Sequence, residues 1–178
     1  SYTVTAAATD EKGATTISNE VAVSVSVQDD GEVHIVSVIA SHSREDAGPE
    51  NTLDGKLSTT WSAHGDGACI QYNLSTPADL TTVALAWARG DTRVAYFDIA
   101  VSVDAVNWTL IAEGMESSGV SDALEHYDIT PAEALHVRVT GHGTSSNEWN
   151  MISEAELGFE ALTPHMYGDP TGNGSVSA

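Results

Sequence analysis

Short runs of alternating apolar and polar residues recur along the 178-residue chain, and they constrain its fold more than any other feature. The runs are rich in Val, Ile, Thr and aromatic residues, and clusters of Gly, Asp, Asn and Ser separate them. Period-two alternation with turn clusters predicts antiparallel β-strands. Helical patterns are nearly absent, so we predict an all-β protein. The clearest central runs are residues 69–74, 82–87, 97–102 and 135–140.

The acidity of the chain excludes several kinds of partner. It has 26 Asp and Glu against 6 Lys and Arg, a formal net charge of −20. Nucleic acids and anionic membranes need a basic surface, so we expect neither. No run of about 18 apolar residues predicts a membrane-spanning helix. The extreme acidity favours a secreted or cell-surface protein, and the single cysteine allows no internal disulfide.

The pattern divides the chain into four segments. Residues 1–28 contain two alternating runs, which are too few strands for a stable domain. Residues 29–33 form an acidic linker, and residues 34–160 form the main domain. Residues 161–178 are rich in Gly, Pro and Ser, and we expect a linker followed by the start of another segment.

Both end segments resemble parts of other modules. The run YTVTAAATDEKG at residues 2–13 resembles the last strands of a bacterial immunoglobulin-like or cadherin-like repeat. The alternative is that residues 1–28 join the main domain as an extra layer. The run DPTGNGSV at residues 169–176 follows the start of an EF-hand loop and resembles the start of a dockerin module. Its alternative is a flexible linker, because half a loop holds a cation poorly.

Five motifs of the main domain occur in the order typical of one family. They are ENTLDGKLSTTW at residues 50–61, IQYNL at 70–74, FDIAVSVDAVNW at 97–108, VRV at 137–139 and ISEAEL at 152–157. Together they resemble the discoidin, or F5/8 type C, family, and within it the bacterial carbohydrate-binding modules of family 32. The resemblance implies a jelly-roll-like antiparallel β-sandwich that binds ligand with loops at one end. Ala105 stands where relatives usually have Gly.

The resemblance also implies a structural Ca²⁺ near residues 50–61. Ca²⁺ takes six to eight hard oxygens, including carboxylates and backbone carbonyls. Glu154 and Glu156 share one strand face, so spacing does not separate them, and the family alignment favours Glu154. The alternative is an ordinary Asp-Gly turn beside a solvated glutamate. The candidate ligands are Asp54, Thr59, Glu154, Asn51, Lys56 and Glu156.

Two further motifs resemble ligand-binding loops of one branch of these modules: WARGDTR at residues 87–93 and HGTSSNEWN at residues 142–150. Asn and Arg bond sugar hydroxyls, an aromatic ring covers a C–H face, and Arg clamps a carboxylate through two parallel bonds. An acidic polysaccharide such as alginate is therefore the first expected ligand, and a galactose-type neutral sugar the second. The candidate ligand-binding residues are Arg89, Arg93, Asp91, His142, Asn147, Trp87, His42 and Arg44.

Structural roles are the alternatives to ligand binding. Arg93 can pair with Asp91 and hold its own loop. Arg138 lies in a strand, where we expect a structural role, and Cys69 lies in an apolar strand, where we expect a buried and inert thiol. Tryptophans of β-sandwiches commonly pack in the core, which is the alternative for Trp61, Trp87, Trp108 and Trp149.

No recognised catalytic motif is present: neither H-E-x-x-H, nor G-x-S-x-G, nor a P-loop, nor G-x-G-x-x-G. We therefore predict a non-catalytic, calcium-stabilised carbohydrate-binding module that, beside flanking domains, targets a secreted polysaccharide-degrading enzyme to its glycan. One alternative is a structural or adhesion module of a cell-surface or filamentous extracellular protein. Another is a β-sandwich lyase, for which Tyr96, His126 and Arg138 would have to converge.

Overall fold

The computed structural model describes residues 2–4, 7–9, 15–17, 21–23 and 32–161. The chain divides into two compact units, Ser1–Glu32 and Val33–Ala178. The half-loop expected at residues 169–176 lies outside the described residues, as does most of the expected linker at 29–33. In the part of the chain that is described, no helix is long and apolar enough to span a membrane.

The first unit contains four short strands that pair in two antiparallel ladders. Tyr2 lies opposite Val23 in the first ladder, and Ala7 lies opposite Ile17 in the second. The first ladder thus pairs the two alternating runs of residues 1–28 with one another. Whether the unit is the end of an immunoglobulin-like repeat stays a prediction. The strands are β1 (Tyr2–Val4), β2 (Ala7–Thr9), β3 (Thr15–Ile17) and β4 (Val21–Val23).

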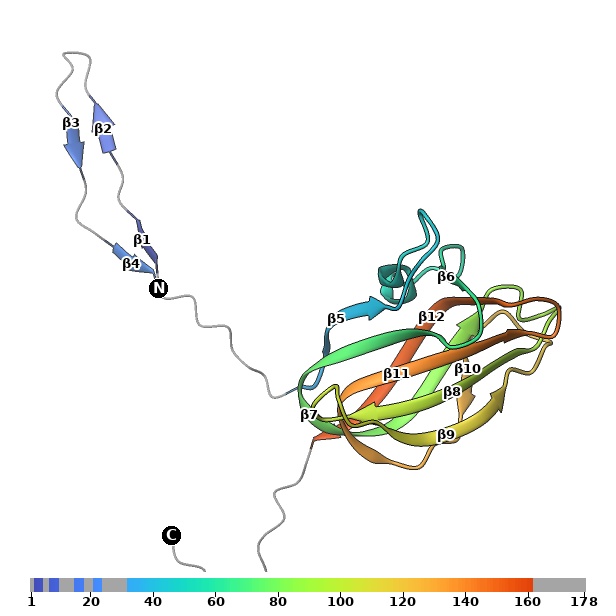
Figure 1. The fold of residues 1–178 in the computed structure, drawn as a ribbon. Coiled ribbons are helices and arrows are strands. Elements are labelled where there is room, and N and C mark those ends of the chain that lie inside the picture. Colours follow the sequence, from blue (N-terminus) through green and yellow to red (C-terminus); the bar gives the residue numbers. More distant parts are fainter. Residues whose placement is uncertain (1, 5–6, 10–14, 18–20, 24–31, 162–178) are drawn as a thin grey trace, which may run out of the picture. The chain divides into compact units, whose positions relative to one another are not determined.

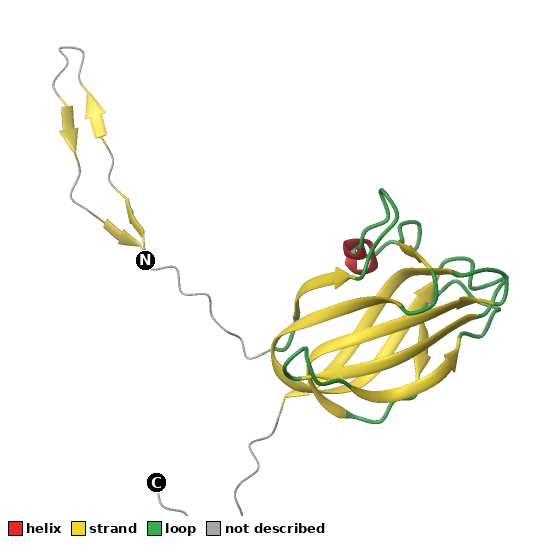
Figure 2. Cartoon of the chain, viewed as in Figure 1, coloured by secondary structure: helices red, strands yellow, loops and turns green. Residues whose placement is uncertain are grey.

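The second unit is built from strands and one short 3₁₀ helix (Figures 1 and 2). All of its strand pairings are antiparallel, which confirms the predicted all-β sandwich class. In chain order the elements are β5 (Ile35–Ala40), η1 (Pro49–Leu53), β6 (Trp61–His64), β7 (Ala68–Trp87), β8 (Ala95–Ser102), β9 (Thr109–Glu116), β10 (Glu125–Tyr127), β11 (Ala132–Thr144) and β12 (Trp149–Ala161).

Strand β7 belongs to both layers of the sandwich. Its first part pairs with β5 on one side and β11 on the other, which gives a first layer in the order β5, β7, β11, β8, β9. Its last part pairs with β10 and β12, which gives a second layer in the order β10, β7, β12, β6, and its residues 78–80 also pair with the start of β11. The loops β6–β7, β7–β8 and β11–β12 therefore lie together at one end, which we call the loop end. The bend of β7 lies at the opposite end.

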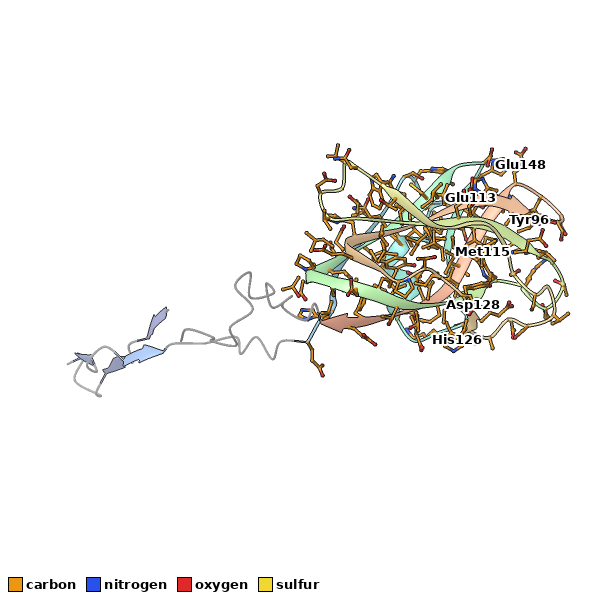
Figure 3. The ribbon with its side chains drawn as sticks, turned by 90° about the horizontal axis from the view of Figure 1, so that it is seen from below. Tyr96, Glu113, Met115, His126, Asp128 and Glu148 are labelled. Atoms are coloured by element: carbon orange, nitrogen blue, oxygen red, sulfur yellow. The ribbon has the colours of Figure 1, made fainter. Side chains whose placement is uncertain are left out.

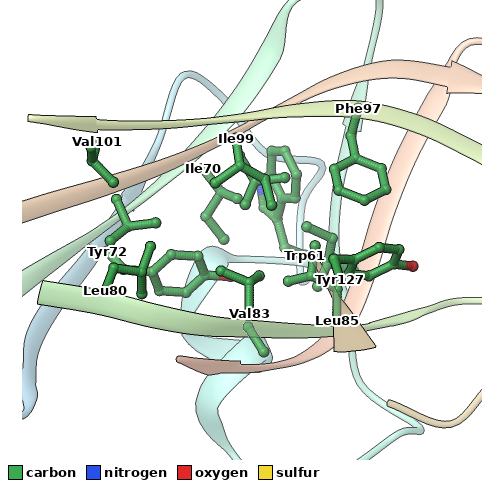
Figure 4. Packing of buried hydrophobic residues seen from close by; sticks show 14 of the residues in the cluster. Trp61, Ile70, Tyr72, Leu80, Val83, Leu85, Phe97, Ile99, Val101 and Tyr127 are labelled. Carbon is green, nitrogen blue, oxygen red and sulfur yellow. The ribbon is translucent and has the colours of Figure 1, made fainter. Parts of the chain in front are cut away.

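The hydrophobic core fills the space between the two layers (Figure 4). Its residues alternate with outward-facing ones along β7 and β8, as the pleat of a strand requires. Full burial of one such side chain stabilises a fold by about 1.5–3 kcal/mol. The largest core side chains, each less than 2% exposed, include Trp61, Tyr72, Phe97, Ile70, Leu80, Leu85, Ile99 and Ile152.

One buried polar side chain organises the loop end. Asn150 is 2% exposed; its Oδ1 accepts the N–H of Gly143 at 2.8 Å, and its Nδ2 donates to the carbonyl of Gly65 at 2.8 Å. A Cβ on Gly141 of the neighbouring strand would collide with the Asn150 carboxamide. Glycine at 141 thus leaves room for the amide of Asn150, which joins the β6–β7 loop to the end of β11.

The turn between β8 and β9 contains a residue in the left-handed region, Ala105 with a φ of 57°. The Asp104 carboxylate accepts the N–H groups of Val106 at 2.9 Å and Asn107 at 2.8 Å, which holds the turn in this form. A residue with a Cβ pays roughly 1–2 kcal/mol in this conformation, whereas glycine does not. The Gly usual in the resembling family therefore has a physical reason.

We expect Ala105→Gly to raise the free energy of unfolding by about 1 kcal/mol, because it removes that strain. Equilibrium urea denaturation measures the change. The matched control is Ala123→Gly at an exposed position outside the left-handed region, where the added chain entropy leaves stability unchanged or lower. Equal effects of the two substitutions would contradict the strain at Ala105.

Candidate functional site

Three arginines from two loops line one depression of about 300 Å³, together with Ser62, Trp149 and Met151; we call it the arginine depression. Arg44 comes from the loop between β5 and η1, and Arg89 and Arg93 come from the β7–β8 loop. Met151 pairs with Ser62 across β12 and β6, so the floor is the outer face of the second layer. The structure thus brings together three cations that are up to 49 positions apart in the sequence (93 − 44).

Arg93 is positioned by a backbone carbonyl rather than by a carboxylate. Arg93 donates from Nε and Nη2 to the carbonyl of Ala88 at 3.1 and 2.7 Å, and Nη2 also contacts the Met151 sulfur at 3.3 Å. Arg89 has a φ of 59°, in the left-handed region. Burial, and next the positive charge of Arg89, lower the pKa of Arg93 from its ordinary value. Two cations are therefore held close to one another.

Within residues 32–161, no Asp or Glu lies within ion-pair distance of Arg44, Arg89 or Arg93. The alternative pairing of Arg93 with Asp91 is therefore not formed. Asp91 is exposed and does not line the depression. No carboxylate among the described residues therefore forms an ion pair with any of the three guanidinium groups.

A half-buried ring, Trp149, forms one wall of the arginine depression. It contacts the His64 ring edge to face, with centroids 5.1 Å apart, and His64 lies 3.7 Å from the Glu148 carboxylate at the rim of the module (Figure 3). His42 does not line the depression but bonds the His64 carbonyl from Nε2 at 3.0 Å. The sequence motif at 142–150 contained Trp149, but core packing is the commoner role of tryptophan in sandwiches, so the prediction omitted it.

Trp87 was wrongly included among the ligand-binding residues. It is 3% exposed, packs on Phe97 with ring centroids 4.8 Å apart, and donates from Nε1 to the hydroxyl of Tyr127 at 2.9 Å. An indole in this position stabilises the core and offers no face to a ligand. Strand β7 ends at Trp87, and the loop that begins with Ala88 and Arg89 reaches the surface.

His142 and Asn147 do not line the arginine depression, so the prediction of one cluster is wrong for them. Along β11, Val139 and Gly141 face the core and His142 faces outward from the first layer, whereas Met151 faces outward from the second. Asn147 bonds its own loop: its Oδ1 accepts the N–H of Trp149 at 3.1 Å. The shared sequence motif thus divides between two faces.

The residues proposed for a β-sandwich lyase do not converge. Tyr96 lies on β8 in the first layer, and His126 lies on β10 in the second, well apart in Figure 3. Arg138 lies on β11 with its side chain stacked over the ring of Trp108. The three side chains therefore form no common site.

The expected calcium ligands form a loop closed around Asp54. Its carboxylate accepts the hydroxyl of Thr59 at 2.8 Å and the N–H of Lys56 at 2.9 Å, and the Lys56 ammonium lies 3.6 Å away. The hydrogen bond from Thr59 is the main reason that the pKa of Asp54 is lowered. Asn51 donates to the carbonyl of Thr60 at 2.9 Å and so fixes the end of the loop.

Glu154 and Glu156 differ in a way that the sequence did not reveal. Both line a depression of about 460 Å³ with Gly55 and Leu57, but Glu156 is exposed, whereas Oε2 of Glu154 is buried and has no hydrogen-bond partner. Burial raises the pKa of Glu154 from its ordinary value, and the nearby charge of Asp54 raises it further. Among the described residues, no three His, Cys, Asp or Glu side chains are grouped to hold a metal ion.

His142 bridges two carboxylates on the outer face of the first layer. Its Nδ1 lies 2.6 Å from Asp66 and its Nε2 lies 2.9 Å from Asp98. The hydrogen bond to Asp66, followed by that to Asp98, raises the pKa of His142 from its ordinary value. A histidine whose pKa is raised in the folded state contributes stability that is complete below its unfolded pKa of about 6.5 and is lost as pH rises through the folded value.

We therefore expect wild type to exceed His142→Gln in melting temperature by more at pH 6 than at pH 9. Differential scanning calorimetry at both pH values measures the two differences. The control is His126→Gln, which removes an exposed histidine without a carboxylate partner among the described residues. A difference that grows with pH would contradict the double ion pair.

Comparisons with known proteins assign the second unit. Residues 37–155 match the family model described as F5/8 type C domain. The CBM32 of AlyQ in complex with 4,5-unsaturated mannuronic acid is 41% identical, with a TM-score of 0.67 over 70% of this chain and 95% of that one. A pectin-binding carbohydrate-binding module is 29% identical, with a TM-score of 0.68 over 75% of this chain and 96% of that one.

A third structure, the family 32 module of NanJ from C. perfringens in complex with galactose, is 15% identical, with a TM-score of 0.58 over 70% of this chain and 93% of that one, and shows a shared fold. A truncated AlyQ with CBM32 and alginate lyase domains also matches, but this chain covers 32% of its length. A comparison with curated proteins gave no match. The chain therefore belongs to the F5/8 type C domain family, and its second unit is a non-catalytic carbohydrate-binding module of the family 32 type.

Proposed function

We propose that the arginine depression binds the carboxylate of an acidic polysaccharide, with alginate as the first candidate and a galactose-type neutral sugar as the second. The observation that carries the proposal is three guanidinium groups lining one depression without a carboxylate partner among residues 32–161, in a chain of net charge −20. The structure of the module that is 41% identical is a complex with 4,5-unsaturated mannuronic acid, which supports the same class of ligand.

The chemistry of the depression suits a uronate. A guanidinium group donates two parallel hydrogen bonds to one carboxylate, and these charged bonds are stronger than neutral ones. Arg93 is oriented by the Ala88 carbonyl, and part of the Trp149 ring remains exposed beside it to cover an apolar sugar face. Arg89 is kept in a left-handed conformation that disfavours side chains, and such strain is commonly found at functional positions.

The expected role is to hold a catalytic partner near its substrate. One small, wet site gives weak affinity, because few ligand atoms are buried. Weak binding still raises the effective concentration of an attached enzyme on a polymer that repeats the same sugar. The proposed setting is a secreted polysaccharide-degrading enzyme, in line with the alginate lyase domains that accompany the similar module of AlyQ.

The proposal includes a structural Ca²⁺ held by the loop of Asp54. The donor set fits the ion: Asp54 and Glu154 place two carboxylates close enough to repel one another, and Oε2 of Glu154 is buried without a donor. Ca²⁺ needs no third carboxylate, because backbone carbonyls complete its shell. The carbonyls of Asn51 and Lys56 and the Thr59 hydroxyl are the further oxygens of this loop. The ion would fix the loop; Glu156, which is exposed, would stay outside its shell.

We expect Arg89→Gly to weaken binding of alginate oligosaccharides at least about tenfold, because it removes charged hydrogen bonds worth roughly 1.5–3 kcal/mol. Isothermal titration calorimetry measures the dissociation constant. Glycine also relieves the strained backbone, so the variant stays folded and separates lost binding from lost structure. Arg89→Lys is the matched control, because it retains the charge and loses the planar fork.

The proposal fails if Arg89→Gly binds alginate as wild type does. Equal binding of neutral galactose oligosaccharides would favour the second ligand class. No glycan binding, together with self-association in sedimentation, would favour the adhesion alternative.

Calcium has its own test. We expect a chelator to lower the melting temperature of wild type by several degrees, because an ion at 100 times its Kd stabilises the folded state by about 2.7 kcal/mol. Glu154→Gln should lose this response, while its chelated form melts no lower than chelated wild type, because the substitution removes the repulsion with Asp54. Glu156→Gln is the matched control and should respond as wild type does. An unchanged melting temperature on chelation of wild type would exclude the ion.

A further inference from the structure

A second depression, of about 190 Å³, lies on the outer face of the first layer, away from the arginine depression. It is lined by Ile39, Ala40, Ser41, Cys69, Gln71 and Arg138, and we call it the sheet depression. Ile39 on β5, Gln71 on β7 and Arg138 on β11 are direct cross-strand partners and form one row across the sheet. These side chains belong to paired strands, so the shape of the depression is set by the sheet itself.

Arg138 is an unpaired cation in this row. Its Nη2 donates to Oε1 of Gln71 at 3.2 Å, and its Nε is buried without a hydrogen-bond partner. Among the described residues, no carboxylate lies within ion-pair distance of it. A guanidinium has five N–H donors, and one of those of Arg138 bonds another side chain, so its accessible donors are open to solvent or to a ligand. A half-buried charge without an ionic partner is costly, and an incoming anion would offset that cost.

Trp108 gives the cation its orientation. The guanidinium carbon of Arg138 lies 3.6 Å from the centroid of the Trp108 ring, which fixes the plane of the fork through a cation–π contact. The expected structural role of Arg138 is therefore present, but it uses only one face of the group. Nη2 already reaches Gln71 at the wall of the depression, so we expect a carboxylate to meet the guanidinium group through its terminal nitrogens rather than through the buried Nε.

The other walls limit the size and chemistry of an occupant. Ile39 is 52% exposed and, with Ala40, gives an apolar wall, whereas Ser41 and Gln71 are polar. Pockets for drug-sized ligands have volumes of about 300–1,000 Å³, so this smaller one fits a single sugar ring rather than an oligosaccharide. A sugar acid offers a carboxylate for Arg138 and a C–H face for Ile39.

We propose that the sheet depression binds one carboxylate-bearing sugar residue, held by Arg138 and packed against Ile39. This proposal does not depend on the one for the arginine depression, since the two depressions lie on outward faces of different layers and share no residue. A module with both sites contacts acidic glycan on two faces.

Cys69 makes the site measurable. It was expected to be buried and inert, but it faces outward, is half-buried and lines the sheet depression. It is also the chain's single cysteine. An occupant of the depression would shield its sulfur from a small neutral reagent.

The experiment follows the rate at which iodoacetamide alkylates Cys69 in the full chain, with increasing D-glucuronate or with D-glucose. The two sugars differ by a carboxylate in place of a CH₂OH group. We expect glucuronate to slow alkylation several-fold in a saturable way and glucose to leave the rate unchanged. Equal effects of the two sugars, or no effect of glucuronate, would overturn the site.

Two variants assign the effect to Arg138. Gln71→Glu is nearly isosteric and places a carboxylate where Nη2 already finds an acceptor, so it should abolish protection by glucuronate while the protein stays folded. Arg138→Lys loses the planar fork and should weaken protection. Protection that survives in Gln71→Glu would contradict the proposal even if Arg138→Lys fails to fold. Arg89→Gly should retain full protection, which separates this site from the arginine depression.

Discussion

The whole second unit depends on one strand that pairs in both layers. β7 joins β5 and β11 with its first part and β10 and β12 with its last part, so it sets the register of both layers. A slip of one residue would turn every side chain of a strand to the opposite face. Such a slip would move Gln71 into the core and Tyr72 into water. The alternation of core residues along β7 prevents such a slip, and the outward side chains of both layers keep their positions as a result.

Much of the fold could be predicted from the sequence, because strand alternation and turn residues are local signals. The runs at 69–74, 82–87, 97–102 and 135–140 all lie in strands of the structure. The bends were harder to predict. β7 continues from the first of these runs through the second, although Pro77 and polar neighbours lie between them, because β11 pairs with both parts of it and β12 pairs with the last part.

The candidate site could be predicted only in part, because distance in space and direction of a side chain are not local signals. Arg44, Arg89 and Arg93 were expected near one another and line one depression. Trp149 and His142 come from the same sequence motif, but they project from strands of different layers, which their spacing in the sequence does not show. Glu154 and Glu156 share a face, and only the burial of one carboxylate oxygen distinguishes them.

The start of β5 and the end of β12 both lie at the bend of β7 (Figure 1). Ile35, at the start of β5, lies opposite Leu74, and Ala161, at the end of β12, lies opposite Ala78. A pulling force between residues 33 and 161 would therefore open these two strand ends one hydrogen bond at a time. The loops that hold the arginines are at the far end and would carry little of the load. Tension along the polypeptide would therefore leave the geometry of the arginine depression unchanged.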